Sequence, residues 1–259
     1  MKLSYRLKGA VLGLLLAVIC SGPVSAQSGP IIAVAANLRF VIEEVARSFY
    51  DESGISVRFS FGSSGNLSRQ IIQGAPFEMF MSADEDYVFR VSEAGASADR
   101  GKIYAVGRIA AYAPKGSPLQ QVAFPAGYVG VLNKQTKQRF AIANPDLAPY
   151  GRAAKEALEH AGLWQAMRPR LIYGENISQT AQFILSGSTF GGIIAYAQAL
   201  SSPFKENGDY QLIPASWHKP IAQRMVLLNR SGDTTRRFYA YLSEVQAVAI
   251  FQKYGFTVP

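Results

Sequence analysis

Short apolar runs alternate with amphipathic segments along most of the chain. In the first third, apolar runs at 31–35, 55–61 and 77–81 are separated by helix-patterned segments at 38–50 and 66–73. Within 38–50, Leu38, Ile42 and Val45 recur at the spacing of one helical face. This alternation predicts an α/β fold, in which a mainly parallel sheet is flanked by helices.

The same alternation continues to the end of the chain, without an internal repeat or a Pro/Gly/Ser-rich linker. Further strands are expected at 108–113, 140–143, 171–173, 191–196 and 222–228, and further helices at 84–94, 150–161, 177–185, 234–242 and 245–254. We predict two lobes: 27–107 plus 218–259 as lobe I, and 108–217 inserted as lobe II. Because ligands of open α/β sheets bind beyond the carboxyl ends of the strands, the cleft between the lobes is the expected site.

The first 26 residues have the pattern of a cleavable signal peptide rather than of the fold. A basic start is followed by an apolar run at 10–19 and by the small residues of Val24-Ser25-Ala26. The alternative, a membrane anchor, needs ~20 apolar residues. Lipid attachment at Cys20 is disfavoured because Ile19, directly before it, is large. The chain is therefore expected to be exported and periplasmic.

The residues that support catalysis or metal binding are scarce. The chain has two histidines, His160 and His218, and Cys20 lies in the expected signal peptide. No nucleophile, phosphate-loop or dinucleotide motif is present. The formal net charge is +8, but the basic residues are scattered, which does not indicate nucleic-acid binding. These observations favour a binding protein over an enzyme, with no cofactor and no cation site.

Four expected helices begin directly after strands, and their first residues suit anion binding. The junctions are at 36–38, 61–67, 148–151 and 175–178, two in each predicted lobe. We expect Asn37 to be an N-cap. Free N–H groups and the partial positive charge at helix starts attract anions when several converge. The alternative, that each start only caps its own helix, is not excluded by the sequence.

The residues around these junctions match a known family. The chain resembles the periplasmic molybdate-binding component of ABC transporters, which has the two-lobed type II periplasmic binding-protein fold. The resemblance covers nearly the whole chain after the signal peptide. The matching segments are 33–38, Phe61-Gly62-Ser63-Ser64-Gly65-Asn66-Leu67, 74–76, Phe80-Met81-Ser82-Ala83-Asp84, 143–145, 149–151, 154–158 and 251–256.

The resemblance implies which residues contact the oxyanion. Asn37 stands where many relatives have Ser, so its backbone N–H is kept and its side chain is an amide. Ser64 is expected to donate through its hydroxyl and its N–H, and Tyr150 through its phenol. Ile177 is expected to contribute a backbone N–H, and Ala36 a further one.

The implied function is capture of molybdate, with tungstate as a second ligand, and its delivery to an inner-membrane permease with its ATPase. The protein is expected to be a monomer. Three alternatives stay open: a binding protein for another tetrahedral oxyanion such as sulfate or thiosulfate, an exported enzyme, and a sensor that uses the same cleft. Many relatives have a tyrosine near residue 195, where this chain has Tyr196 one position later.

Overall fold

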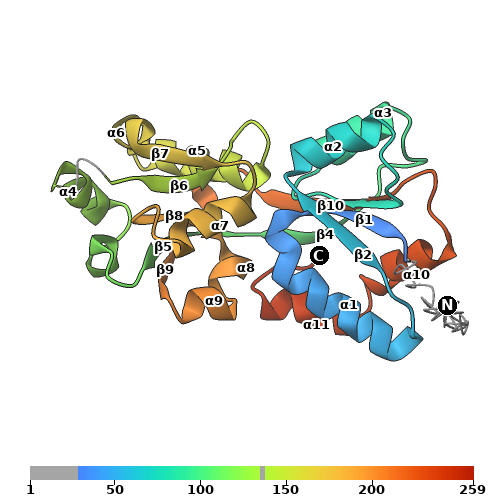
Figure 1. Cartoon of the computed structure of the whole chain (residues 1–259). Coiled ribbons are helices and arrows are strands. Elements are labelled where there is room, and N and C mark those ends of the chain that lie inside the picture. Colours follow the sequence, from blue (N-terminus) through green and yellow to red (C-terminus); the bar gives the residue numbers. More distant parts are fainter. Residues whose placement is uncertain (1–28, 135–137) are drawn as a thin grey trace, which may run out of the picture.

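The computed structural model describes residues 29–134 and 138–259, which form two α/β lobes side by side (Figure 1). Lobe I is built on a five-stranded sheet with the order β2-β1-β3-β10-β4. Its strands are β1 (Ile31–Ala35), β2 (Arg58–Gly62), β3 (Met79–Met81), β4 (Lys102–Gly107) and β10 (Ile221–Leu227). Its helices are η1 (Ala36–Leu38), α1 (Arg39–Ser53), α2 (Ser64–Ile72), α3 (Asp86–Glu93), α10 (Asp233–Tyr241) and α11 (Val245–Lys253).

Lobe II is built on a second five-stranded sheet with the order β7-β6-β8-β5-β9. Its strands are β5 (Ile109–Pro114), β6 (Phe140–Ala143), β7 (Leu171–Gly174), β8 (Gly191–Ala195) and β9 (Gly208–Leu212). Its helical elements are η2 (Pro118–Gln121), α4 (Ala126–Lys134), α5 (Pro149–His160), α6 (Trp164–Met167), η3 (Arg168–Arg170), α7 (Ile177–Leu185), α8 (Tyr196–Ala199) and α9 (Ser202–Lys205). The short η4 (Ala215–Trp217) lies on the way back to lobe I.

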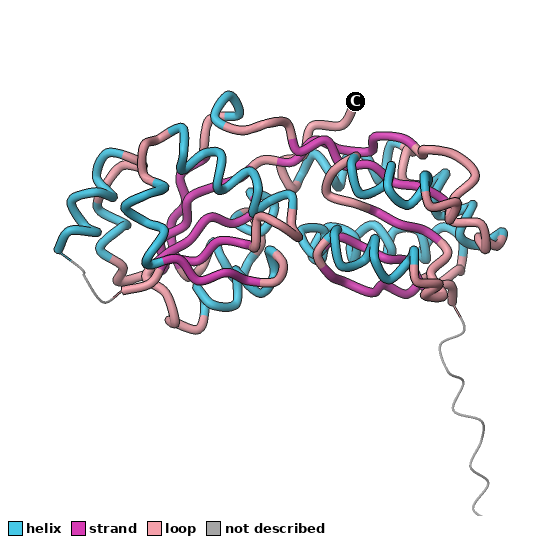
Figure 2. Tube along the Cα trace, turned by 90° about the horizontal axis from the view of Figure 1, so that it is seen from above, coloured by secondary structure: helices cyan, strands magenta, loops and turns pink. Residues whose placement is uncertain are grey.

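The apolar runs of the sequence become strands because helices cover them. Every residue of β6 and β8 is buried, as are four of the five residues of β1. Figure 2 shows the strands of each lobe flanked by helices. Strands buried on both faces show continuous apolar runs rather than alternation, which is the pattern in the sequence. The predicted two-lobed α/β fold is confirmed.

Each sheet is parallel on one side and antiparallel on the other. In lobe I, β1 pairs in parallel with β2 and β3, whereas β10 is antiparallel to β3 and β4. In lobe II, β6 is parallel to β7 and β8, whereas β5 is antiparallel to β8 and β9. The antiparallel strands are those next to the passages between the lobes, since β4 leads directly into β5 and β9 precedes β10.

The chain passes between the lobes twice, at Arg108 and through residues 213–220. Both ends of the described chain therefore lie in lobe I, where the blue and red segments of Figure 1 meet. The boundaries at 107/108 and 217/218 stay a prediction, and the signal peptide at 1–26, with Cys20, lies outside the described residues. Within the described residues no helix is long and apolar enough to cross a membrane.

The lobes are in contact in this structure, so the cleft between them is narrow. One cluster of buried residues combines Ala35, Ala36 and Ala83 of lobe I with lobe II residues such as Ala148 and Ile177. The ends of β1, β2, β6 and β7, each followed by a helix, meet at this contact. This places the four predicted helix starts together.

Candidate functional site

A small cavity lies between the lobes at the four strand-to-helix junctions. Its volume is about 10 Å³, far below the roughly 300–1,000 Å³ of pockets for drug-sized ligands. It is lined by Ala35, Ala36, Asn37, Gly62, Ser63, Ser64, Ala83, Ala148, Pro149, Tyr150, Asn176 and Ile177. The cavity therefore suits a small ion.

All five residues expected to contact an oxyanion line this cavity. Ala36 and Asn37 come from lobe I directly after β1, and Ser64 is the first residue of α2. Tyr150 and Ile177 come from the starts of α5 and α7 in lobe II. Each of the five is at most 3% exposed. The structure brings them together, and their contact with a ligand stays a prediction.

Three backbone N–H groups at the cavity are free because of where the helices begin. Ser64 and Ile177 are the first residues of their helices, and Tyr150 is the second. Residues in the first turn have no helical carbonyl to bond. Among the described residues, no hydrogen-bond partner is found for any of these three N–H groups. They remain available to a ligand.

The hydroxyl of Ser64 is held as an acceptor by the protein. The N–H of Ala83 donates to Ser64 Oγ at 2.9 Å. The preceding Ser63 caps α2, since its Oγ accepts the N–H of Asn66 at 3.4 Å. The helix thus begins at Ser64, two residues before the predicted start at Asn66, because Ser63 caps it. Because Ser64 Oγ accepts this bond through one of its lone pairs, the hydroxyl proton is left to be donated into the cavity.

The hydroxyl oxygen of Tyr150 is likewise held as an acceptor by the protein. Its Oη accepts from Asn37 Nδ2 at 3.3 Å and from Gln223 Nε2 at 3.1 Å. Burial raises the pKa of Tyr150 well above its usual range, so the phenol keeps its proton at neutral pH. Two donors already point at this oxygen, which leaves its proton for a third group.

Asn37 does not have the capping role that the sequence predicted. It lies inside the 3-10 helix η1, and no side-chain cap is formed at the start of η1 or of α1. Its Nδ2 donates instead to Gln223 Oε1 at 3.0 Å and to Tyr150. The prediction was wrong because these partners are distant in sequence, and a buried amide bonds to whichever groups packing places beside it.

Two residues of this network were missed by sequence reasoning. Gln223 of β10 is fully buried, and Tyr104 of β4 is 4% exposed. Tyr104 Oη lies 2.9 Å from Gln223 Oε1 and 3.1 Å from the carbonyl oxygen of Ser82. The available signal was a glutamine within the apolar run 221–227, because a buried amide requires partners.

The cavity offers neutral donors and no ionised side chain. Its lining has no Asp, Glu, Lys, Arg or His. Among the described residues, no group of three or more His, Cys, Asp or Glu side chains is placed to hold a metal ion. His160 stacks on Trp217, and His218 Nδ1 lies 2.8 Å from the carbonyl oxygen of Lys219. Donors without carboxylates suit an anion rather than a cation.

Hydrogen bonds across the cleft hold the lobes together around the cavity. The N–H of Gly65 donates to the carbonyl of Leu147 at 3.0 Å, and Tyr87 Oη donates to that of Asp146 at 3.0 Å. Ser178 Oγ donates to the carbonyl of Ala36 at 2.9 Å. A further bond joins Asn66 Nδ2 to Glu175 Oε1. The described conformation is a closed one.

The sequence matches the model of a family described as bacterial extracellular solute-binding protein, over residues 31–257. The chain belongs to this family. Molybdate-binding protein ModA of Rhodobacter capsulatus is 32% identical to this solute-binding protein over 93% of each chain. ModA of Azotobacter vinelandii is 31% identical over 87% of this chain and 88% of its own.

Comparison with solved structures leads to the same family of relatives. The periplasmic molybdate-binding protein of Azotobacter vinelandii superposes with a TM-score of 0.79 at 28% identity, over 89% of this solute-binding protein and 99% of its own chain. The predicted resemblance is thus confirmed. Tyr196, which replaces a tyrosine expected one position earlier, is not part of the cavity lining, and its ring lies 5.5 Å from that of Tyr210.

Proposed function

We propose that this solute-binding protein captures molybdate, and also tungstate, in the cavity between its lobes. In this proposal it acts in the periplasm as a monomer without catalysis, and delivers the anion to an inner-membrane permease with its ATPase. The observation that carries the proposal is the small buried cavity lined by donors from both lobes. The molybdate-binding relatives named above support the choice of ligand.

The donors are of the kind that a buried dianion needs. An ion removed from water loses several kcal/mol of solvation that the site must replace. Each hydrogen bond to a charged acceptor contributes about 1.5–3 kcal/mol. Two hydroxyls with unclaimed protons, on Ser64 and Tyr150, and the free N–H groups of Ser64, Tyr150 and Ile177 can replace that solvation without a cation.

The charge state of the ligand follows from the same donors. In this proposal the protein directs O–H and N–H groups at the ligand, so each ligand oxygen must accept. A protonated oxyanion such as hydrogen phosphate would place its own O–H against a donor, and the unpaired contact disfavours it. Sulfate satisfies the charge requirement, and its smaller size is what separates it from molybdate and tungstate.

The experiment is a panel of oxyanions on the protein without its first 26 residues. Thermal unfolding is followed with molybdate, tungstate, sulfate, thiosulfate and phosphate, and each ligand that raises the melting temperature is titrated calorimetrically. We expect molybdate and tungstate to stabilise the protein strongly. Stabilisation by sulfate or thiosulfate alone would assign the site to that anion, and no response to any oxyanion would contradict the proposal.

Ser64→Ala tests whether the cavity is the site. Loss of a hydrogen bond to a charged ligand should weaken molybdate binding at least about tenfold. Ser68→Ala is the matched control, since Ser68 is a buried serine of the same helix whose Oγ donates to the carbonyl of Tyr87 rather than lining the cavity. Equal affinities for Ser64→Ala and the control would place the ligand elsewhere.

A further inference from the structure

Gln223 contacts lining residues of both lobes without lining the cavity itself. It is fully buried in β10, and its amide contacts Asn37 after β1, Tyr104 of β4 and Tyr150 of α5. Among these four residues, Asn37 and Tyr150 line the cavity. Gln223 therefore stands directly behind two of the groups expected to face the anion.

The two ends of the amide have different partners. Gln223 Oε1 accepts from Asn37 Nδ2 at 3.0 Å, and Tyr104 Oη, whose one proton is shared with the carbonyl of Ser82, lies 2.9 Å from it. Its Nε2 consequently points at Tyr150 Oη, at 3.1 Å. An amide nitrogen has only protons to offer, so Tyr150 must accept from Gln223.

The backbone beside Tyr150 and Gln223 leaves their side chains little room to change rotamer. A Cβ atom on Gly107 would lie 2.2 Å from Tyr150 Oη and 2.8 Å from Gln223 Nε2, so the contact is pressed against the bare backbone of β4. The pairing of β10 with β4 shifts register between Gln223 and Arg224.

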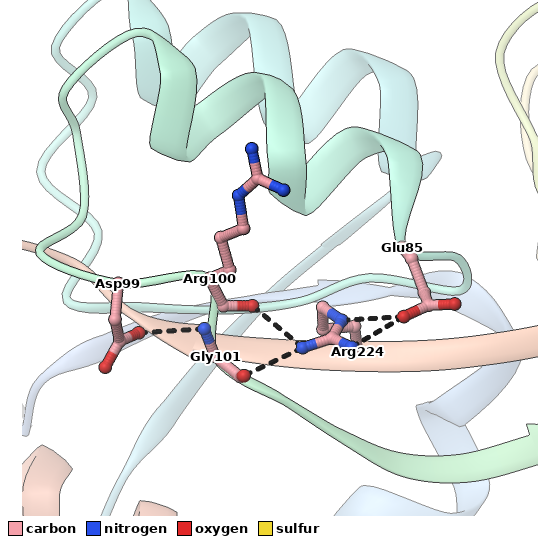
Figure 3. Close-up of polar contacts among 5 residues, drawn as sticks. All are labelled: Glu85, Asp99, Arg100, Gly101 and Arg224. Carbon is pink, nitrogen blue, oxygen red and sulfur yellow. Dashed lines mark hydrogen bonds and ion pairs between the residues drawn. The ribbon is translucent and has the colours of Figure 1, made fainter.

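The next residue, Arg224, anchors β10 through groups that do not line the cavity. Its Nε and Nη2 donate to Glu85 Oε1 at 2.9 and 2.6 Å (Figure 3). Its Nη1 donates to the carbonyls of Arg100 and Gly101 at 3.1 and 2.8 Å. These bonds tie β10 to the start of α3 and to the segment before β4. The strand that carries Gln223 is thus fixed at the neighbouring residue.

We infer that Gln223 is a positioning residue that makes the hydroxyl of Tyr150 a donor toward the bound oxyanion. This inference rests on the proposed function. With Gln223 Nε2 and Asn37 Nδ2 both directed at its oxygen, the Tyr150 hydroxyl turns its proton to the cavity. Without Gln223, the hydroxyl can rotate and present a lone pair, which repels the anion. Gln223 thereby contributes to selection of fully deprotonated oxyanions.

The experiment is a double-mutant cycle of Gln223→Met and Tyr150→Phe, with molybdate affinity measured calorimetrically. Methionine has a similar length and no amide. We expect Gln223→Met to weaken binding on the order of tenfold in the wild-type background and to have little effect in Tyr150→Phe, because groups that act through one contact are not additive. The same loss in both backgrounds, or no loss in either, would overturn the inference.

Gln211→Met is the matched control for structural damage. Gln211 of β9 is also bonded at both ends of its amide, since Nε2 donates to the carbonyl of Val122 and Oε1 accepts the N–H of Phe124. It lies away from the cavity, so its variant should keep wild-type affinity. Melting temperatures of all variants without ligand show whether the fold is retained.

A pH profile of Gln223→Glu provides a second readout. An ionised carboxylate only accepts, so the Tyr150 hydroxyl would donate to residue 223 and turn its lone pair to the ligand. Residue 223 is fully buried, so the pKa of a carboxyl there should be raised. Protonation at lower pH then restores a donor, so affinity should recover as pH falls from 8 to 6, and the recovery should be larger with Tyr150 than in the Tyr150→Phe background. Equal recovery in both backgrounds would reduce the effect to charge repulsion and overturn the inference. A wild-type protein that binds no oxyanion would instead overturn the proposed function.

Discussion

Gly65 lies where the first turn of α2 meets lobe II, and a methyl group there should prevent closure. Its N–H donates to the carbonyl of Leu147 at 3.0 Å. A Cβ on this residue would lie 2.8 Å from Tyr87 Oη, 2.9 Å from Tyr87 Cζ and 3.0 Å from the Leu147 oxygen. Favourable contacts between such atoms are about 3.5–4.0 Å. In Gly65→Ala the Tyr87 ring must therefore shift, which strains its bond to Asp146 of lobe II, and the Leu147 carbonyl must move back by a few tenths of an ångström.

The cost falls mainly on the closed form, because Leu147 belongs to lobe II and because the bond from Tyr87 to Asp146 holds the Tyr87 ring beside Gly65 when the lobes are in contact. Overpacking of this kind costs about 1–3 kcal/mol, and the strained Gly65–Leu147 hydrogen bond contributes about 0.5–1.5 kcal/mol more. The two terms sum to about 1.5–4.5 kcal/mol. Because Leu147 must give by only a few tenths of an ångström, the lower part of this range, about 2–3 kcal/mol, applies to the form that holds the ligand and lowers affinity roughly 30- to 150-fold. In the open form the alanine lies in a helix, which it favours by up to about 1 kcal/mol over glycine.

The assay compares molybdate affinity with thermal stability in the absence of ligand. We expect Gly65→Ala to bind weakly while its melting temperature equals or exceeds that of the wild type. Gly130→Ala is the matched control, because Gly130 lies in α4 and an added Cβ meets no atom within 4 Å. Wild-type affinity in Gly65→Ala would refute the reasoning, since the lobe contact seen here would then not belong to the ligand-bound form.

Two further predictions concern residues beside the cavity. Tyr87→Phe removes the hydrogen bond from Tyr87 Oη to the carbonyl of Asp146, so molybdate affinity should fall roughly 2- to 10-fold with unchanged stability. Calorimetric titration measures the affinity, and a loss above about a hundredfold, or no loss, would contradict the prediction. Burial raises the pKa of Asp84 from 3.8 to about 6, so the folded state binds this proton more tightly and loses stability as pH rises through that window. Asp84→Asn should therefore be more stable than the wild type at pH 7 by up to about 3 kcal/mol, with the difference vanishing toward pH 4, because a tenfold shift in proton binding corresponds to about 1.4 kcal/mol. Urea unfolding at both pH values measures this, and equal stabilities at pH 7 would contradict it.

The helix starts were predictable because their signals are local. Pro149 at the start of α5 and Asn176 before α7 are residue types that begin helices. The order of strands and helices then brings the ends of β1, β2, β6 and β7 to one cleft. These signals predicted the four junctions, whereas the five individual lining residues were implied by the family resemblance.

The partners of Asn37 were not predictable, because no local pattern encodes them. The bond from Asn37 to Gln223 joins residues 186 positions apart, and the one to Tyr150 joins residues 113 positions apart. The strand that carries Tyr104, β4, was not predicted either. The edge strand β9 was missed because none of its residues is buried, so it has no apolar face to mark it.

The neutral lining also bears on how a ligand would leave. If the anion is held as proposed, its donors are divided between the lobes, with Ser64 and Asn37 in one and Tyr150 and Ile177 in the other. A cation in either lobe would keep attracting the anion after the lobes separate. Neutral donors act only over hydrogen-bond distances, and they weaken sharply beyond about 3.5 Å. Separation of the lobes would therefore remove half of the donors and admit water to the rest, so opening alone is sufficient to release the ligand.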